Sequence, residues 1–139
     1  MIGMDDPFFE FLHPKTWKPA QGYANGVVAQ GRQVFIAGQI GWNENAELVS
    51  NDLVAQAEQA LSNIAAVLAE AGGVPHHLTR LTWYVTDKAA YFARRKEIGA
   101  VYRRIIGRHF PAMTLIVVAG LLEDGAQVEI EATAVIPNR

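Results

Sequence analysis

The stretch LVAQAEQALSNIAAVLAEAGG, residues 53–73, decides the fold class because its apolar residues recur every three or four positions. That spacing puts them on one side of a helix and leaves polar side chains elsewhere on its surface. The Ser-Asn-Asp sequence at 50–52 is suited to cap the start of this helix, and the Gly-Gly sequence at 72–73 to end it in a left-handed turn. The stretch therefore predicts an amphipathic helix with one apolar stripe.

Strand segments lie on the C-terminal side of this helix. Residues 78–86 and 126–136 alternate apolar and polar side chains, which is the period of a strand with one buried face. In the second segment the alternation puts Glu129 and Glu131 on the face opposite the apolar residues. The run 113–122 is nearly continuous in apolar and β-branched residues, and it predicts a central strand buried on both faces.

The remaining segments complete an α+β order. Residues 23–29 and 33–40 predict two strands joined by a tight turn, and residues 41–50 predict a loop. Apolar residues at helical spacing predict a second helix over 89–107. The resulting order is β-β-α-β-α-β-β, and each helix offers one apolar stripe. We therefore expect a single sheet with both helices on one face and a second face of mixed polarity that favours contact with further copies of the chain.

The first 22 residues differ in composition from the rest of the chain. Pro7, Pro14 and Pro19 disfavour a helix or an interior strand, and the aromatic residues between them argue against a free tail. We therefore expect an irregular N-terminal arm over residues 1–22, packed on the domain or on a neighbouring subunit. The rest, residues 23–139, forms a single α+β domain.

Composition and charge exclude whole classes of function. The 139 residues contain 12 Lys and Arg against 14 Asp and Glu, a net charge of −2, which offers no basic surface for a phosphate backbone. No cysteine is present, so disulfides, thiolate nucleophiles and thiolate metal sites are excluded. The N-terminus is acidic where a secretion signal is basic, and the longest apolar run is far shorter than a membrane-spanning helix. We expect a cytoplasmic protein that binds neither nucleic acid nor membranes.

The glutamates of the last predicted strand are the strongest chemical candidates. Glu129 and Glu131 share one face, where a carboxylate can serve as a general base for water; the alternative is the solvated outer face of an edge strand. The Gly38-Gln39 sequence either ends a strand in a turn or brings an exposed backbone N–H beside a ligand. The four histidines have none of the usual metal-binding spacings, so we expect no metal and no cofactor.

A set of short motifs occurs in a fixed order from about residue 20 to residue 136. The motifs are Gly22-Tyr23, IAGQI at 36–40, Gln56 with LSN at 61–63, AGG at 71–73, FPAM at 110–113 and VEIEA at 128–132. In order and spacing they resemble the Rid family of reactive intermediate deaminases, also called YjgF-like or L-PSP endoribonuclease-like proteins. Each motif is weak alone, whereas the set covers nearly the whole chain.

The resemblance implies a chorismate-mutase-like α+β fold that forms a homotrimer with ligand clefts between subunits. It further implies hydrolysis of a small-molecule enamine or imine to a carbonyl compound and ammonia. The resemblance assigns the catalytic acid/base role to Glu129. It assigns substrate-binding positions to six further residues, which are Tyr23, Ala37, Gly38, Gln39, Met113 and Leu115.

Three of these positions depart from the family pattern, and the departure at Met113 bears most directly on the substrate. Met113 stands where the deaminases carry the arginine that grips the substrate carboxylate, and methionine offers neither charge nor hydrogen-bond donors. Ala37 stands where a small hydroxyl residue is common, and Leu115 is apolar for the cleft. We therefore expect a substrate other than the usual α-imino acids, unless a helix arginine of a neighbouring subunit, such as Arg94, Arg95 or Arg103, supplies the missing contact.

Two other functions compete with this interpretation. A non-catalytic trimer of the same fold that binds a small metabolite agrees with an apolar cleft, because such a cleft holds ligands without reactive groups. An endoribonuclease activity is disfavoured by the net charge of −2 and by the lack of a basic surface with interleaved aromatic residues.

Overall fold

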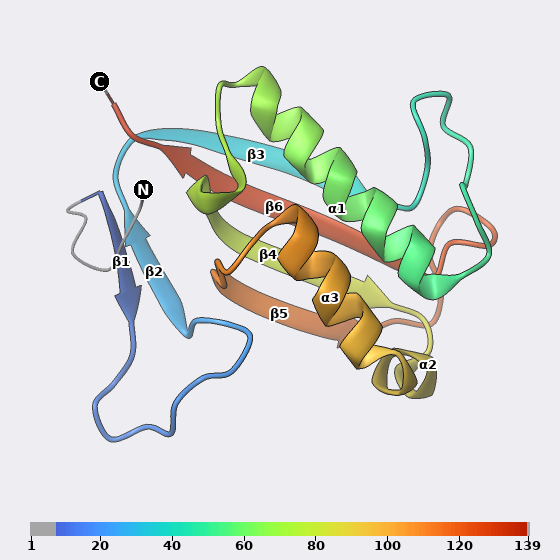
Figure 1. The fold of residues 1–139 in the computed structure, drawn as a ribbon, viewed down its shortest axis with the longest axis horizontal. Helices are drawn as coiled ribbons and strands as arrows, with labels where there is room; N and C mark the ends of the chain where they lie inside the picture. Colours follow the sequence, from blue (N-terminus) through green and yellow to red (C-terminus); the bar gives the residue numbers. More distant parts are fainter. Residues whose placement is uncertain (1–7, 139) are drawn as a thin grey trace.

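The computed structural model describes residues 8–138, and its centre is a four-stranded sheet. Across this sheet the strands run in the order β3 (Arg32–Gln39), β6 (Val128–Ile136), β4 (Leu78–Val85) and β5 (Ala112–Val117). Both β3 and β4 are antiparallel to β6, whereas β4 and β5 are parallel (Figure 1). The α+β class predicted from the sequence is confirmed, and β6 lies inside the sheet rather than at its edge.

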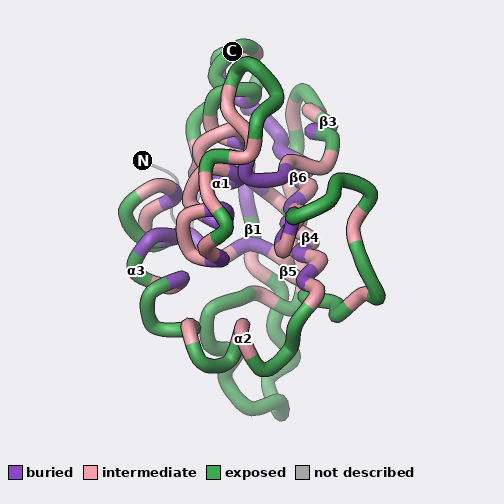
Figure 2. Tube along the Cα trace, turned by 90° about the vertical axis from the view of Figure 1, so that its right-hand side faces the viewer, coloured by how far each residue is buried: buried purple, intermediate pink, exposed green. Residues whose placement is uncertain are grey.

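Helix α1 (Leu53–Glu70) has the ends that the sequence predicts. The Asp52 side chain accepts a hydrogen bond from the Ala55 amide at 3.0 Å, and Gly72 adopts a φ of +81° just after the helix. α1 and α3 (Arg95–Ile105) cover the same face of the sheet (Figure 1). The apolar residues of β4, β6 and the inner side of α1 are buried together between these layers (Figure 2).

The second predicted helix is broken, so the expectation of one helix over 89–107 is wrong. The chain forms α2 (Lys88–Ala93), leaves the helical conformation at Arg94, and continues as α3. The Arg94 guanidinium is held by Asp52 Oδ1 at 2.9 Å and by Glu97 Oε1 at 2.6 Å. These ion pairs tie the break to the start of α1.

The N-terminal segment forms a small second sheet, which corrects two expectations. β1 (Phe9–Leu12) pairs antiparallel with β2 (Gly26–Ala29), so the arm is not irregular throughout and the chain does not form a single sheet. Phe9 is fully buried, with its ring 5.3 Å from the ring of His109, and this packing anchors the strand. The predicted arm also includes residues 1–7, which lie outside the described residues.

Strand β5 is the clearest disagreement with the sequence analysis. The apolar run predicts a central strand buried on both faces, but β4 is the one strand of the four-stranded sheet that pairs with β5, which lies at the edge with a single further bridge from Ala112 to Ala24. Leu115, Ile116 and Val117 are 38%, 41% and 47% exposed. An apolar run favours burial but does not specify what covers it, and here nothing within the described chain does.

No helix among residues 8–138 has both the length and the apolar character needed to span a bilayer.

Candidate functional site

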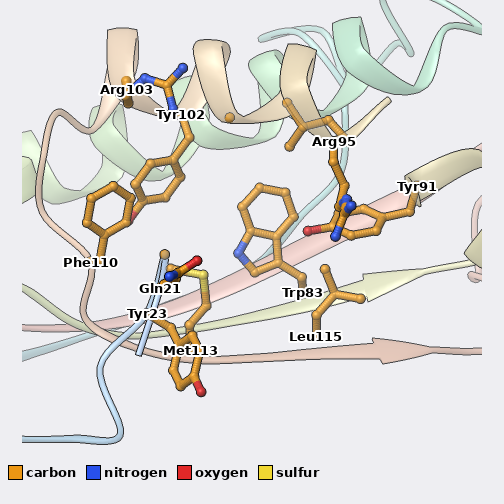
Figure 3. Close-up of a pocket in the computed structure, with 13 residues that line it drawn as sticks. Gln21, Tyr23, Trp83, Tyr91, Arg95, Tyr102, Arg103, Phe110, Met113 and Leu115 are labelled. Atoms are coloured by element: carbon orange, nitrogen blue, oxygen red, sulfur yellow. The ribbon is translucent and has the colours of Figure 1, made fainter. Parts of the chain in front are cut away.

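A pocket of about 610 Å³ opens on the helix side of the sheet, between α3 and strands β4 and β5 (Figure 3). Met113 and Leu115 contribute its floor from β5, where they pair with Leu81 and Trp83 of β4. Tyr23, from the segment before β2, lines the same pocket. Three of the residues assigned to substrate binding from the sequence therefore come together in the structure.

Aromatic side chains that the sequence analysis did not single out make the walls of this pocket. Trp83, Tyr91, Tyr102 and Phe110 all line it (Figure 3). The Tyr102 and Phe110 rings stack with centroids 5.4 Å apart, and the Tyr102 hydroxyl donates to the His109 carbonyl at 2.6 Å. Burial raises the pKa of Tyr102, so this hydroxyl stays protonated. The wall is therefore rigid and largely apolar.

Arginines reach the pocket from its own subunit. Arg95 and Arg103 line it from α3, whereas Arg94 points elsewhere, to Asp52 and Glu97. The Arg95 guanidinium carbon lies 4.8 Å from the centre of the Phe92 ring. The pocket therefore carries positive charge along its helix side.

Glu129 lies on the other face of the sheet, packed against the end of β3. A Cβ atom at residue 38 would come within 2.0 Å of Glu129 Oε2, so any larger residue there would force the end of the glutamate side chain to move from its present position. The neighbouring Gln39 side chain donates to the Ala37 carbonyl at 3.0 Å, beside an irregularity in the pairing of β3 with β6. Gly38 therefore adjoins Glu129, with Ala37 and Gln39 as its neighbours along β3, and Gln39 pairs with Ile130 rather than with Glu129.

The second glutamate on this face is already engaged. Glu131 accepts a short hydrogen bond from the Tyr84 hydroxyl. This bond to Glu131, more than burial, raises the pKa of Tyr84, because ionisation of the phenol would place two negative charges together. Within the described chain no such hydrogen bond holds the Glu129 side chain, which leaves it the freer of the two for chemistry.

Strand register separates the predicted site residues into two groups. Glu129 pairs with Tyr84, on the face away from the helices, and Met113 pairs with Leu81, on the face toward them. Residues paired across neighbouring strands point to the same side of a sheet. The carboxylate and the pocket floor therefore lie on opposite faces of one subunit.

Metal-binding groups are absent from the part of the chain that the structure describes, where no three His, Asp or Glu side chains gather closely enough to hold an ion. The adjacent His76 and His77 end the short 3₁₀ turn η1 (Pro75–His77) just before β4. His77 Nδ1 accepts a hydrogen bond from the Val74 amide at 3.0 Å, a structural role.

Known proteins resemble this chain along most of its length. A family model described as Endoribonuclease L-PSP matches residues 14–136. The chain is 39% identical over 124 residues to Protein DfrA of Myxococcus xanthus, with 88% of each chain covered. It is 33% identical over 116 residues to the 2-iminobutanoate/2-iminopropanoate deaminase of Escherichia coli, covering 81% of this chain and 86% of that one. A crystal structure of YyfB from Yersinia pestis, a Rid family protein of unknown function, matches with a TM-score of 0.80 at 37% identity, covering 93% of this chain and 99% of that chain.

Proposed function

Because the chain belongs to the Rid family, also described as Endoribonuclease L-PSP, we propose that it hydrolyses reactive imines or enamines to a carbonyl compound and ammonia. The observation that carries this proposal is the Glu129 carboxylate packed against Gly38, while the Glu131 carboxylate on the same face is occupied by the Tyr84 hydroxyl. A carboxylate beside a glycine, which has no side chain to block the approach of water, is suited to orient and deprotonate a water molecule.

The reaction needs one proton acceptor and no redox partner. Glu129 takes a proton from water as the water oxygen bonds to the imine carbon, and the C=N electron pair moves to nitrogen. The nitrogen takes the proton from Glu129, which gives a neutral amino alcohol and restores the carboxylate. Glu129 then takes the hydroxyl proton and passes it to the amino group as the C–N bond breaks. Ammonia leaves, the hydroxyl oxygen becomes the carbonyl oxygen, and Glu129 is again unprotonated after one turnover.

A second copy of the chain completes the proposed site. Glu129 and the Met113 pocket lie on opposite faces of one sheet, so a single subunit cannot present both to one substrate. The exposed apolar edge formed by Leu115, Ile116 and Val117 supports an interface there. We propose a homotrimer, the closed ring that the family resemblance implies, and light scattering that found a monomer at micromolar concentration would contradict it.

The substrate of this site differs from a small α-imino acid. Met113 replaces the carboxylate-binding arginine, and loss of a buried charge partner typically costs about 2–5 kcal/mol of binding. Met113, Leu115 and the aromatic walls instead favour a substrate with a large apolar group.

A coupled assay tests the proposal. An amino-acid oxidase generates imines in situ from a panel of amino acids. A lyase extends the panel to enamines, and oxidation of amines extends it to imines without an α-carboxylate. The loss of each imine or enamine is followed. The Glu129→Gln variant should lose turnover by about 100-fold or more. Glu131→Gln is the matched control, because it makes the same change two residues away on the same face. Equal turnover by wild type and Glu129→Gln would contradict the proposal.

The alternative is a non-catalytic trimer that binds a small metabolite, and the apolar pocket favours it. Under that alternative, wild type is inert on the whole panel, and Glu129→Gln has no turnover to lose. Met113→Arg separates the two further. If only this variant turns over α-imino acids, the fold is competent for hydrolysis and binding is the better description of the natural protein.

A further inference from the structure

We propose that the pocket takes an organic anion with a bulky apolar body, and that Arg95 holds its anionic group in place of an arginine at position 113. This inference rests on the proposed function, because it names the substrate class of the same site. It differs from the sequence expectation of a contact from a neighbouring subunit, since Arg95 lines the pocket of its own subunit.

Arg95 is available to a ligand because no carboxylate neutralises it. Among the arginines of this region, Arg94 is paired with Asp52 and Glu97, and Arg104 is paired with Glu58 at 2.5 Å. Within residues 8–138 Arg95 has no carboxylate at ion-pair distance, and its guanidinium rests over the Phe92 ring. A guanidinium at a pocket lining, oriented by an aromatic ring and free of a counter-charge, is suited to bind a carboxylate through two hydrogen bonds.

Tyr91 adds a donor beside Arg95. Figure 3 shows the Arg95 guanidinium next to the Tyr91 ring, with the Tyr91 hydroxyl directed toward the interior of the pocket. Burial raises the pKa of Tyr91, so the hydroxyl keeps its proton and can donate to an anion. Arg103, the other arginine of the lining, lies at the far end of α3 (Figure 3).

Trp83 supplies a second, independent sign that a polar ligand atom enters this pocket. Trp83 is only 4% exposed, and its ring nitrogen Nε1 is a buried polar atom with no hydrogen-bond partner in the described structure. Native proteins leave few buried donors unpaired, because each such donor has lost its water without gaining an acceptor. In Figure 3 this nitrogen faces the half of the pocket lined by Gln21 and Met113.

These groups define which parts of a ligand the pocket would bind and where. The anion belongs at the Arg95 and Tyr91 end, and an acceptor such as an imine nitrogen or a carbonyl oxygen belongs at Trp83. The apolar body lies on the floor and wall formed by Leu115, Met113 and Phe110. Because Trp83 Nε1 is closed off from solvent, an acceptor reaches it only when the lining of the pocket shifts.

The test is a calorimetric titration with 3-phenylpropanoate and with its neutral counterpart, 3-phenylpropanamide. Wild type should bind the acid at least about tenfold more tightly than the amide, and Arg95→Gln should remove that preference while leaving amide affinity unchanged. Lys96→Gln is the matched control, since Lys96 is exposed on the same helix and does not line the pocket. It should behave as wild type.

Three results would overturn the inference. They are equal affinity of wild type for acid and amide, no saturable binding of the acid, and loss of the preference in Arg103→Gln but not in Arg95→Gln. The same titration in Glu129→Gln separates this inference from the proposed function, because acid binding should persist there whether or not the wild type shows turnover.

Discussion

Gly38 and Glu129 stand so close that a Cβ atom at residue 38 would lie 2.0 Å from Glu129 Oε2, 2.9 Å from Cδ and 3.0 Å from Cγ. The conflict involves the whole end of the side chain, so a rotation of the carboxylate alone does not relieve it. The backbone of β3 thus defines where the carboxylate on β6 sits, although the two residues are far apart in the sequence.

Replacing Gly38 with alanine should displace the Glu129 carboxylate and lower turnover by about 100-fold, the size of a typical general-base contribution. The Gly120→Ala variant is the control, because a Cβ atom there meets nothing within 4 Å. Both variants should unfold near the wild-type temperature, as followed by circular dichroism. Full activity in Gly38→Ala would contradict the placement of the reacting carboxylate.

Gln56 of α1 should be a large contributor to stability despite being polar. It is fully buried, and its amide donates to the carbonyls of Ser50 and Gly125 at 2.9 Å each and accepts from the Gln127 amide at 2.8 Å. Gln56→Ala should lower the free energy of unfolding by about 3 kcal/mol, because buried partners left unpaired cost about 1–3 kcal/mol each.

The matched control for Gln56 is Gln59→Ala on the same helix. Among the residues that the structure describes, the Gln59 side chain bonds to the Asn63 side chain alone, at 2.8 Å, so its loss should cost about 1 kcal/mol or less. Urea unfolding of both variants provides the measurement. Equal losses would show that the three bonds of Gln56 do not stabilise the join between α1 and the segment before β6.

Stability should fall as the pH drops below neutrality, in part because of His109. Burial lowers the pKa of His109 below 6.5, opposed in part by the hydrogen bond to the Leu78 carbonyl at 2.7 Å. The neighbouring His76 and His77 lower it further. The unfolded chain therefore binds a proton at a higher pH than the folded chain, and stability is full above pH 6.5 and declines toward the folded pKa.

Chemical denaturation between pH 7.5 and pH 5.5 measures this effect, at about 1.4 kcal/mol for each unit by which the pKa is lowered. His109→Gln should flatten the profile, leaving a smaller slope from His77, whose pKa burial also lowers. A His109→Gln profile as steep as that of wild type would assign the pH dependence to other groups.

The periodicity of apolar residues predicted the helix and the strands that have one apolar side and one polar side. The helix over 53–73, with its cap at Asp52, and the alternating strands ending at Val85 and Ile136 appear as the sequence indicated. The buried role of Gln56 could not be predicted in this way, because Gly125 and Gln127, which it bonds, lie far along the chain just before β6. Helical spacing carries no information about such distant partners. The position of β5 could not be predicted either, because an apolar run does not specify its neighbours.

The sequence brought attention to several residues that lie together in the structure, but it could not predict how they are arranged. Tyr23, Met113 and Leu115 share a pocket, and Gly38 adjoins Glu129, yet strand register puts these groups on opposite faces of the sheet. Register depends on pairing between distant segments, which no local pattern encodes. For the same reason Trp83 and Tyr91 were not recognised as pocket residues until β4 and α2 were placed beside α3.

Complementation between two inactive variants tests directly whether the protein is an imine hydrolase whose site is built from two subunits. Glu129→Gln removes the base, and Gly99→Phe places a ring at the pocket lining, where a Cβ atom meets only Arg103 Nη1 at 3.4 Å. Each variant alone should be inactive. Co-refolding equal amounts should restore about a quarter of the wild-type imine turnover, because a ring of mixed subunits then contains intact pairs. If the mixture stays as inactive as its components, the two halves do not meet between subunits and the account fails.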